Sequence, residues 1–271
     1  MYWPILLSIA VYISTVYLMP LLIKTIRPRQ SAFNYQNQET PVGLGLVFSL
    51  TVIPAVIVLL VLKRIPLLQG SIAIITVLGF GFLGLIDDTL GSRDAQGFLG
   101  HFRTLRHGYL TTGALKAVFG MIVAVLVAVV SSSGVANIIF NALNMALWAN
   151  FTNLLDVRPG RAGKFFLLAV LPLIAAGPYS PVLLLAFGSV LGYLPWDLGG
   201  KAMMGDVGSN VLGALIGLGV MGAPFLTKMV ICLALVGIHL YAEKGSLTQV
   251  IERTPFLNYL DSLGRGDLRQ R

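Results

Sequence analysis

Two adjacent acids, Asp87 and Asp88, end a glycine-rich apolar run at residues 79–86. Adjacent helical residues point about 100° apart, so both carboxylates can face one water-filled opening. A divalent cation is the simplest group that would neutralise them there. Magnesium suits such oxygen ligands, because it keeps waters and substrate phosphates in its coordination shell. The plainer alternative is a solvated helix end, although acids are rarely placed at this depth.

A second motif consists of Asn150, Asn153 and Asp156, which recur at every third position at the end of another apolar segment. On a helix this spacing keeps the three side chains within one face. Asparagine in a membrane helix often serves only as interhelical glue. The terminal aspartate makes a binding role the more suggestive interpretation.

Basic residues beside these acids are candidates for holding phosphate groups. Arg158, Arg161 and Lys164 directly follow the second motif, where they could bind a diphosphate or a nucleotide. Anchoring by positive charge at a membrane surface explains them about equally well. Lys116 lies one turn inside the apolar segment 114–131, so its ammonium must face protein or water.

The third motif, Gly-Asp-Val-Gly-Ser at residues 205–209, opens a further apolar segment. Its glycines, Gly205 and Gly208, allow a tight turn and a close backbone approach. A helix that begins here presents free N–H groups and a positive dipole end beside Asp206. This is a place for phosphate bound through a metal, while an aspartate that caps a helix is the alternative.

The elements that must position these motifs are predicted to be membrane helices. The chain has 271 residues, of which 56% are hydrophobic and 11% charged, whereas soluble domains carry about 25% charged residues. A soluble enzyme is therefore excluded. About nine spans are predicted, at residues 3–23, 42–62, 68–86, 114–131, 134–152, 165–177, 179–195, 207–222 and 226–242. The sixth and seventh blocks are short and could instead form one broken span.

The charges assign the two sides of this predicted bundle. All eleven acids, and all basic residues except Lys63, Arg64 and Lys228, fall on one side. That side comprises segments 24–41, 87–113, 153–164 and 196–206 and the tail 243–271. The positive-inside rule makes it cytoplasmic, with the N-terminus outside and the C-terminus inside. We therefore expect an all-α polytopic membrane domain over residues 1–242 and an interfacial amphipathic tail, with no nucleic-acid-binding patch.

The three motifs, in this order, resemble the polyprenyl-phosphate N-acetylhexosamine-1-phosphate transferase superfamily, which includes phospho-N-acetylmuramoyl-pentapeptide transferase. The similarity runs from Thr40-Pro41-Val42-Gly43 to about Gly213. It implies a phosphoglycosyl transferase in a bacterial plasma membrane, with a place in cell-wall biogenesis. Such an enzyme transfers a sugar 1-phosphate from a UDP-sugar to a polyprenyl phosphate at the cytoplasmic face, requires magnesium and releases UMP.

The resemblance also implies roles for individual residues. Asp206 would be a metal ligand, and Asp87 and Asp88 would hold metal or deprotonate the acceptor phosphate. The substrate-binding candidates are Asn150, Asn153, Asp156, Lys116, Arg158, Arg161, Gly208 and Ser209. Within this set, Asn153 and Asp156 would border the nucleotide. Lys116 would meet the lipid phosphate or the diphosphate.

The chain departs from the family pattern after Asp156. It reads Val-Arg-Pro-Gly-Arg-Ala, where the family usually reads Gly-x-Asp-Gly-Leu-Ala, and so it lacks the second acid. The tail around residues 251–265 stands where the family has a histidine-rich loop. Two alternatives stay open: a non-catalytic family member that binds polyprenyl lipid or a partner enzyme, and a transporter or flippase. The sequence also leaves a homodimer open.

Overall fold

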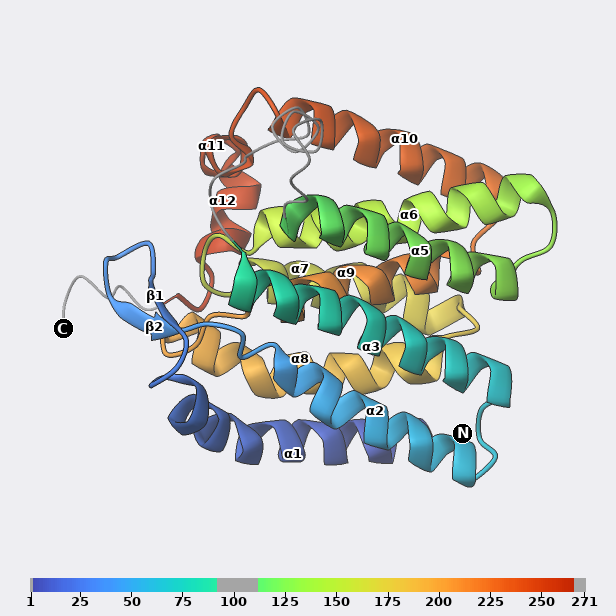
Figure 1. Ribbon diagram of the computed structural model, residues 1–271, viewed down its shortest axis with the longest axis horizontal. Helices are drawn as coiled ribbons and strands as arrows, with labels where there is room; N and C mark the ends of the chain where they lie inside the picture. The colour runs from blue at the N-terminus through green and yellow to red at the C-terminus, as the bar shows by residue number, and fades with distance from the viewer. Residues whose placement is uncertain (1, 92–111, 266–271) are drawn as a thin grey trace.

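The computed structural model describes residues 2–91 and 112–265 and consists almost wholly of helices (Figure 1). This part of the chain contains one two-stranded hairpin, β1 (Ser31–Phe33) and β2 (Glu39–Pro41). Its helices are α1 (Trp3–Ile26), α2 (Leu46–Val61), α3 (Leu67–Leu90), α5 (Thr112–Ser131), α6 (Val135–Leu155), α7 (Arg161–Ala176), α8 (Ser180–Leu198), α9 (Asp206–Val220), α10 (Phe225–Ala242), α11 (Leu247–Arg253) and α12 (Pro255–Ser262). The predicted all-α class is confirmed.

Each of the nine apolar blocks coincides with a helix from α1 to α10. Among the described residues, five helices are long and apolar enough to cross a membrane, namely α1, α3, α5, α8 and α10. Helices α2 and α9 are apolar but shorter. The chain is thus a helical membrane protein, whereas the full set of nine spans and their orientation stay predictions.

The two short blocks form separate helices that fold back on each other. Helix α7 ends before Gly177 and α8 begins at Ser180, and the two helices pack together. A Cβ on Gly163, near the start of α7, would lie 3.2 Å from Leu194, near the end of α8. The two helices are therefore antiparallel neighbours.

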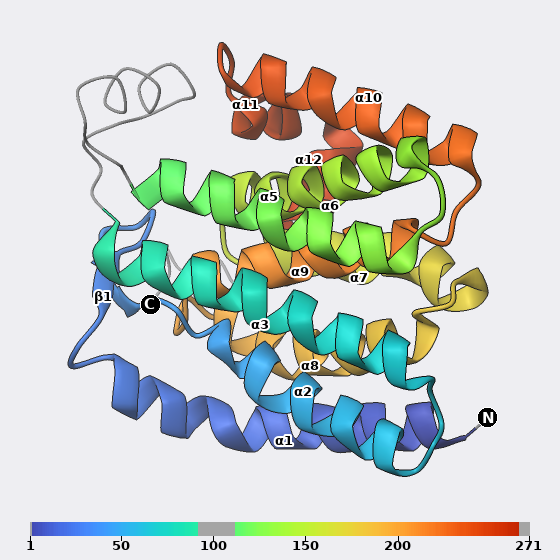
Figure 2. The same ribbon diagram turned by 45° about the vertical axis from the view of Figure 1, so that its right-hand side comes forward.

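Helix α9 lies in the middle of the bundle (Figures 1 and 2). Every residue from Val207 to Val220 is buried, and the helix packs mainly against α3, α6 and α7. A helix that is apolar or glycine-rich on all sides is typical of a core position. The third motif therefore opens the central helix of the bundle.

Glycines bring α9 into backbone contact with α6. A Cβ on Gly213 would lie 2.2 Å from the carbonyl oxygen of Trp148, and one on Gly217 would lie 2.5 Å from the Cα of Met145. These separations are far below van der Waals contact, so the backbones can approach only because both residues lack a side chain. Gly213 and Gly217 therefore allow the close packing of α9 on α6.

We expect Gly213→Ala to lower the thermal unfolding temperature of the purified protein. The added methyl group must displace α9 from α6, and overpacking of this kind costs about 1–3 kcal/mol. Gly237→Ala in α10 is the matched control, because a Cβ there meets nothing within 4 Å. The control should be neutral or slightly stabilising. Equal unfolding temperatures for the two variants would contradict the packing argument.

The loops that carry the polar motifs meet at one end of the bundle. The β1–β2 hairpin and the tail helices α11 and α12 lie at this end (Figure 1). Backbone hydrogen bonds join the segment after β2 to the chain before α9: Met203 donates to Pro41 at 2.9 Å, and Leu44 donates back to Met203 at 3.1 Å. The first loop is thus fixed beside the start of the central helix.

Candidate active site

A cavity of about 410 Å³ opens at this end of the bundle. It is bordered by the hairpin, by the ends of α3, α6 and α8 and by the start of α9. The charged side chains among its described lining residues are Asp88, Asp156, Asp197, Asp206 and Arg158. Carboxylates therefore outnumber cations, and an anionic ligand would need additional positive charge in order to enter.

Asp88 ties the end of α3 to the start of α9. Its Oδ1 accepts a hydrogen bond from the backbone N–H of Asp206 at 2.9 Å, and its Oδ2 accepts one from Val207 at 3.0 Å. These are two of the N–H groups that a helix start leaves without partners. The side-chain amide of Gln30 in turn donates to the backbone oxygen of Asp88 at 2.9 Å. Asp88 thus caps the central helix from a neighbouring element.

Asp206 lies at the centre of a polar cluster. Its carboxylate forms an ion pair with Lys116 of α5, and the Lys116 ammonium also lies 3.6 Å from Asp87. Asn153 of α6 donates from its amide nitrogen to Oδ2 of Asp206 at 3.1 Å. The Ser209 hydroxyl donates to the amide oxygen of Asn153 at 3.3 Å, which fixes the amide orientation. Four helices thus contribute side chains to this cluster.

The cluster fits a magnesium ion that is held jointly with a substrate. Among residues 2–91 and 112–265, no three histidine, cysteine or acidic side chains converge to form a complete metal site. Asp87 and Asp206 do converge on one cation, the ammonium of Lys116. Magnesium is commonly bound by one or two carboxylates, with waters and substrate phosphates as its other ligands. Both oxygens of Asp88 already accept backbone N–H groups, so Asp87 and Asp206 are the better ligands.

Asp156 and Asp197 lie in the same cavity, beyond the ends of α6 and near the end of α8. Burial raises the pKa of Asp156 well above its ordinary value, and the charges of Asp197 and Asp206 raise this pKa further. Asp197 is only 4% exposed, and its Oδ2 accepts a hydrogen bond from the backbone N–H of Gly160 at 2.9 Å. Asp197 thereby holds the α6–α7 loop in place.

Arg158 lies at the rim of the cavity, where it contacts both the β1–β2 hairpin and the C-terminal tail. Its guanidinium stacks over the Tyr35 ring of the hairpin, 4.8 Å from the ring centre. It also forms a 3.2 Å ion pair with Glu252 of α11. The hairpin and the tail therefore meet at a cation that faces the cavity.

The next two cations of the loop bind the tail. The Arg161 guanidinium donates to both carboxylate oxygens of Asp261, at 2.8 and 3.0 Å, and to the Thr248 hydroxyl at 3.0 Å. The Lys164 ammonium donates to three carbonyl oxygens at the end of α12, at 2.6–2.9 Å. Both residues had been candidates for holding a nucleotide or diphosphate, and in the structure their donors are engaged by protein groups.

The structure brings most of the candidate residues together. Lining the cavity are Asp88, Asn153, Asp156, Arg158 and Asp206, and in contact with this group are Asp87, Lys116 and Ser209. Three candidates lie elsewhere. Asn150 is exposed, Gly208 packs against the backbone of Gly45, and Arg161 is buried against the tail.

Two cavity residues, Asp197 and Tyr35, were not among the candidates. Asp197 carries the same signal as Asp87, because it is an acid at the end of an apolar segment on the acidic side of the chain. That signal could have identified it. Tyr35 has no such signal, because it is one exposed aromatic residue in a polar loop.

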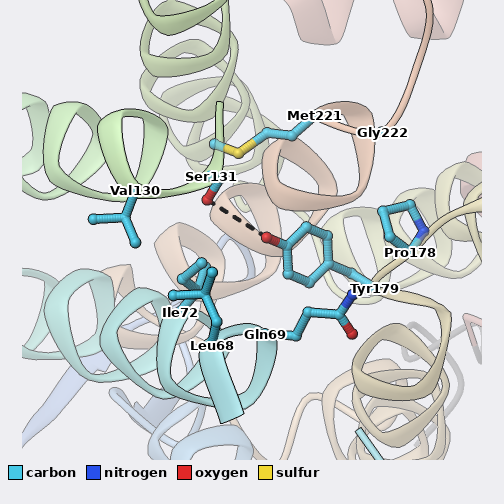
Figure 3. Close-up of a pocket in the computed structure, with 9 residues that line it drawn as sticks. All are labelled: Leu68, Gln69, Ile72, Val130, Ser131, Pro178, Tyr179, Met221 and Gly222. Carbon is cyan, nitrogen blue, oxygen red and sulfur yellow. Dashed lines mark hydrogen bonds between the residues drawn. The ribbon is translucent and has the colours of Figure 1, made fainter. Parts of the chain in front are cut away.

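A second cavity of about 230 Å³ lies at the opposite end of the bundle (Figure 3). The Tyr179 hydroxyl points across it and donates to the Ser131 hydroxyl at 3.5 Å. Its described lining residues carry no charged side chain. The charged side chains that could bind a phosphate or a metal ion thus line the cavity at the acidic end.

Comparison with known proteins gives one family match. A family model described as "Glycosyl transferase family 4" matches residues 71–223. The matched region runs from α3 to just beyond α9, and it contains the end of α3, the end of α6 and the start of α9. No curated protein matches the chain.

Proposed function

Since this match covers more than half of the 271 residues, the chain belongs to glycosyl transferase family 4, and we propose that it is an active phosphoglycosyl transferase. Membership indicates a sugar-phosphate transferase embedded in a membrane. We propose as its specific reaction the transfer of a sugar 1-phosphate from a UDP-sugar to a polyprenyl phosphate. The reaction takes place at the cytoplasmic face of a bacterial plasma membrane and releases UMP.

The observation that carries this proposal is the cluster at the start of α9. Asp88 already accepts the first two N–H groups of α9, so this helix start contributes the positive end of its dipole and not free donors. Here the N-terminus is surrounded by Asp87 and Asp206, which share the Lys116 ammonium. A site that combines acids, one lysine and a helix N-terminus suits the transfer of a phosphoryl group between two anionic partners.

Magnesium is proposed as the cofactor of this cluster, with Asp87 and Asp206 as its protein ligands. When bound, the ion supplies the positive charge that the cavity lacks and stabilises charge on the phosphate oxygens. The excess of carboxylates among the lining residues supports this proposal.

The protein residues then have distinct tasks. An oxygen of the acceptor phosphate attacks the β-phosphorus of the UDP-sugar, the bond from that phosphorus to the bridging oxygen breaks, and UMP leaves with the electron pair. Asp87, whose carboxylate is not tied to a helix start, accepts a proton where the acceptor phosphate carries one. Lys116 can exchange its carboxylate partners for the approaching phosphates, and Asn153 holds Asp206 in orientation.

The tail helices suit a reaction with a membrane-bound acceptor. Helix α12 buries Asp261 against the bundle and exposes Phe256 and Tyr259 by 68% and 63%. Exposed aromatic side chains on a short amphipathic helix are typical of the membrane interface. The tail is therefore proposed to lie at the bilayer surface beside the cavity, where a polyprenyl chain stays in lipid while its phosphate enters the site.

Transport is a weaker alternative. A transporter typically holds its substrate near the middle of the membrane, between broken helices, whereas the acids here line a cavity at the helix ends. A non-catalytic role would not require Asp87, Lys116 and Asp206 to share one ionic cluster.

Release of UMP tests the proposed function. The purified protein, supplied with polyprenyl phosphate, UDP-N-acetylglucosamine and magnesium, should produce UMP and a lipid-linked sugar diphosphate. Omission of the lipid, or chelation of magnesium, should stop UMP release. Absence of UMP with each of a panel of UDP-sugars would refute the proposal.

A further inference from the structure

Lys228 is a cation that α10 turns toward the rest of the bundle. It is the fourth residue of α10, at the end of the bundle opposite the acidic cavity, and it is only 6% exposed. Within this helix the buried residues are Lys228, Cys232 and Leu235, and the helix packs mainly against α6 (Figures 1 and 2). A lysine that only anchors a membrane helix extends its ammonium to the water interface. A lysine that faces inward instead marks a candidate functional site and needs a partner.

Two asparagines of α6 hold Lys228 in this place. The Lys228 ammonium donates to the amide oxygen of Asn137 at 3.1 Å. The amide nitrogen of Asn144 donates to the backbone oxygen of Lys228 at 3.0 Å. Asn137 and Asn144 are seven residues apart, so they lie on one face of α6. Helix α6 therefore orients both the backbone and the side chain of this lysine.

The described protein offers the Lys228 ammonium no negative charge. Each acidic residue that the structure describes lies at the other end of the bundle, in the hairpin, at the cavity end of a helix or in the tail. The ion pairs within residues 2–91 and 112–265 do not include Lys228. An ammonium carries three protons, and in the described chain only Asn137 accepts one of them. Because a buried charge without a counter-charge is costly, an external anion fits this position.

Hydrogen bonding at this interface is also incomplete on the acceptor side. The amide oxygens of Asn141 and Asn144 are buried, and neither has a donor in the described part of the chain. Buried polar atoms usually bond to protein or to ordered water. The α6–α10 interface thus combines unused donors with unused acceptors. A hydrated headgroup can satisfy both kinds, whereas a hydrocarbon chain can satisfy neither.

The surface around Lys228 is apolar, which suits a lipid better than a soluble anion. Val135 at the start of α6 is 74% exposed, and Leu226 at the start of α10 is 64% exposed. Val230, half a turn beyond Lys228, is exposed as well. In a membrane these side chains contact acyl chains. A phospholipid can cover them with its chains while its phosphate reaches the ammonium, and a free phosphate ion gains no such contact.

We propose that Lys228 and Asn137 bind the phosphate of an anionic phospholipid in the membrane leaflet opposite the cavity. Basic sites between membrane helices commonly bind anionic headgroups. The unpaired charge of Lys228 favours a headgroup with a net negative charge over a zwitterionic one. Headgroup hydroxyls, or the waters that accompany the phosphate, can donate to the unused asparagine oxygens. This site is separate from the proposed reaction and does not depend on it.

Lipid binding to the full-length protein tests the site. The purified protein in detergent is mixed with dioleoyl-phosphatidylglycerol or with dioleoyl-phosphatidylcholine, which has the same acyl chains, and bound molecules are counted by native mass spectrometry. The unmodified protein should bind one phosphatidylglycerol molecule about tenfold more tightly than phosphatidylcholine, as expected for a hydrogen bond to a charged group. Lys228→Met keeps an unbranched side chain without the charge, and it should lose this one preferred molecule.

Three further variants separate the charge of Lys228 from its packing. Lys63→Met removes an exposed positive charge at the same end of the bundle and should leave the preference unchanged. Lys228→Arg keeps the charge and should retain the preference. Asn137→Leu keeps the lysine but removes its acceptor, so it should weaken phosphatidylglycerol binding several-fold. This last variant tests the site even if Lys228→Met does not fold.

The outcomes decide between a lipid site, a free-anion site and a structural lysine. Loss of the preference in Lys228→Met, with retention in Lys63→Met and Lys228→Arg, supports the lipid site whether or not UMP is released. Equal binding of the two lipids to the unmodified protein overturns it, as does a preference that survives both Lys228→Met and Asn137→Leu. Equal losses in Lys228→Arg and Lys228→Met would show that packing and not charge is involved. Displacement of the lipid by equimolar inorganic phosphate would refute the lipid as occupant.

Discussion

Asp206→Asn should reduce UMP release by about 10²- to 10³-fold, the loss typical when one group that stabilises transition-state charge is removed. The substitution keeps the size of the side chain and an oxygen for the Asn153 amide. It removes the charge that Asp206 shares with Lys116. The cluster then loses one of its two proposed magnesium ligands and the partner that positions the lysine.

The measurement compares initial rates of UMP release at saturating magnesium for the unmodified protein, Asp206→Asn and Glu39→Gln. Glu39→Gln has the same change in charge outside the cavity and should retain full activity. Asp206→Asn should also unfold at a temperature close to that of the unmodified protein, because the Asp206 N–H still donates to Asp88. If Asp206→Asn keeps more than a tenth of the rate, its carboxylate is not a metal ligand of the reaction.

The fold class and the location of the site were predictable from local sequence features. Long apolar blocks predict membrane helices, and each block coincides with a helix. The charges placed all eleven acids on one side of the bundle, and Asp87, Asp156 and Asp206 do lie at the same end of it. In a bundle of alternating helices, every second connection lies at the same end. The grouping of these acids therefore does not depend on how the helices pack against one another.

Roles that depend on contacts between distant segments were not predictable. Asp88 was expected to hold metal or to deprotonate the acceptor phosphate, and nothing in the sequence indicated that its two oxygens also cap a helix that begins 118 residues later. Arg161 and Lys164 were candidates for binding an anionic substrate, yet the tail engages their donors. A cation in a loop has the same sequence signal whether its partner is a ligand or a distant carboxylate, and packing decides which of them it meets.

Arg161→Leu should release the tail from the bundle. Arg161 and Asp261 are both about 5% exposed and share two hydrogen bonds. Removal of one partner from a buried pair costs about 3–5 kcal/mol, and Arg265, which also pairs with Asp261, should keep the cost near the lower end of this range. Docking of α11 and α12 should weaken accordingly, and trypsin should cleave after the exposed Arg253 about 10²- to 10³-fold faster wherever cleavage follows undocking.

Acid should have the same effect on the unmodified protein. Burial alone would raise the pKa of Asp261, but the hydrogen bonds and charges of Arg161 and Arg265 outweigh it and lower this pKa below its ordinary value. A carboxylate with a lowered pKa stabilises the folded state fully above its ordinary pKa of 3.8. This contribution is lost as the pH falls through the lowered value. Tail docking should therefore be constant near neutral pH and should weaken only below about pH 4.

The double variant Arg161→Leu with Asp261→Leu distinguishes the buried charge from the lost contact. When both members of a buried pair are replaced by apolar residues of similar size, the cost is often small. If the Asp261 charge that has lost Arg161 drives undocking, the double variant should be cleaved more slowly than Arg161→Leu and should lose the acid dependence. If the two variants are cleaved equally fast, the tail is held by the Arg161 hydrogen bond to Thr248 and by packing of the tail against α7. The Arg161–Asp261 ion pair would then orient the tail without stabilising its docking.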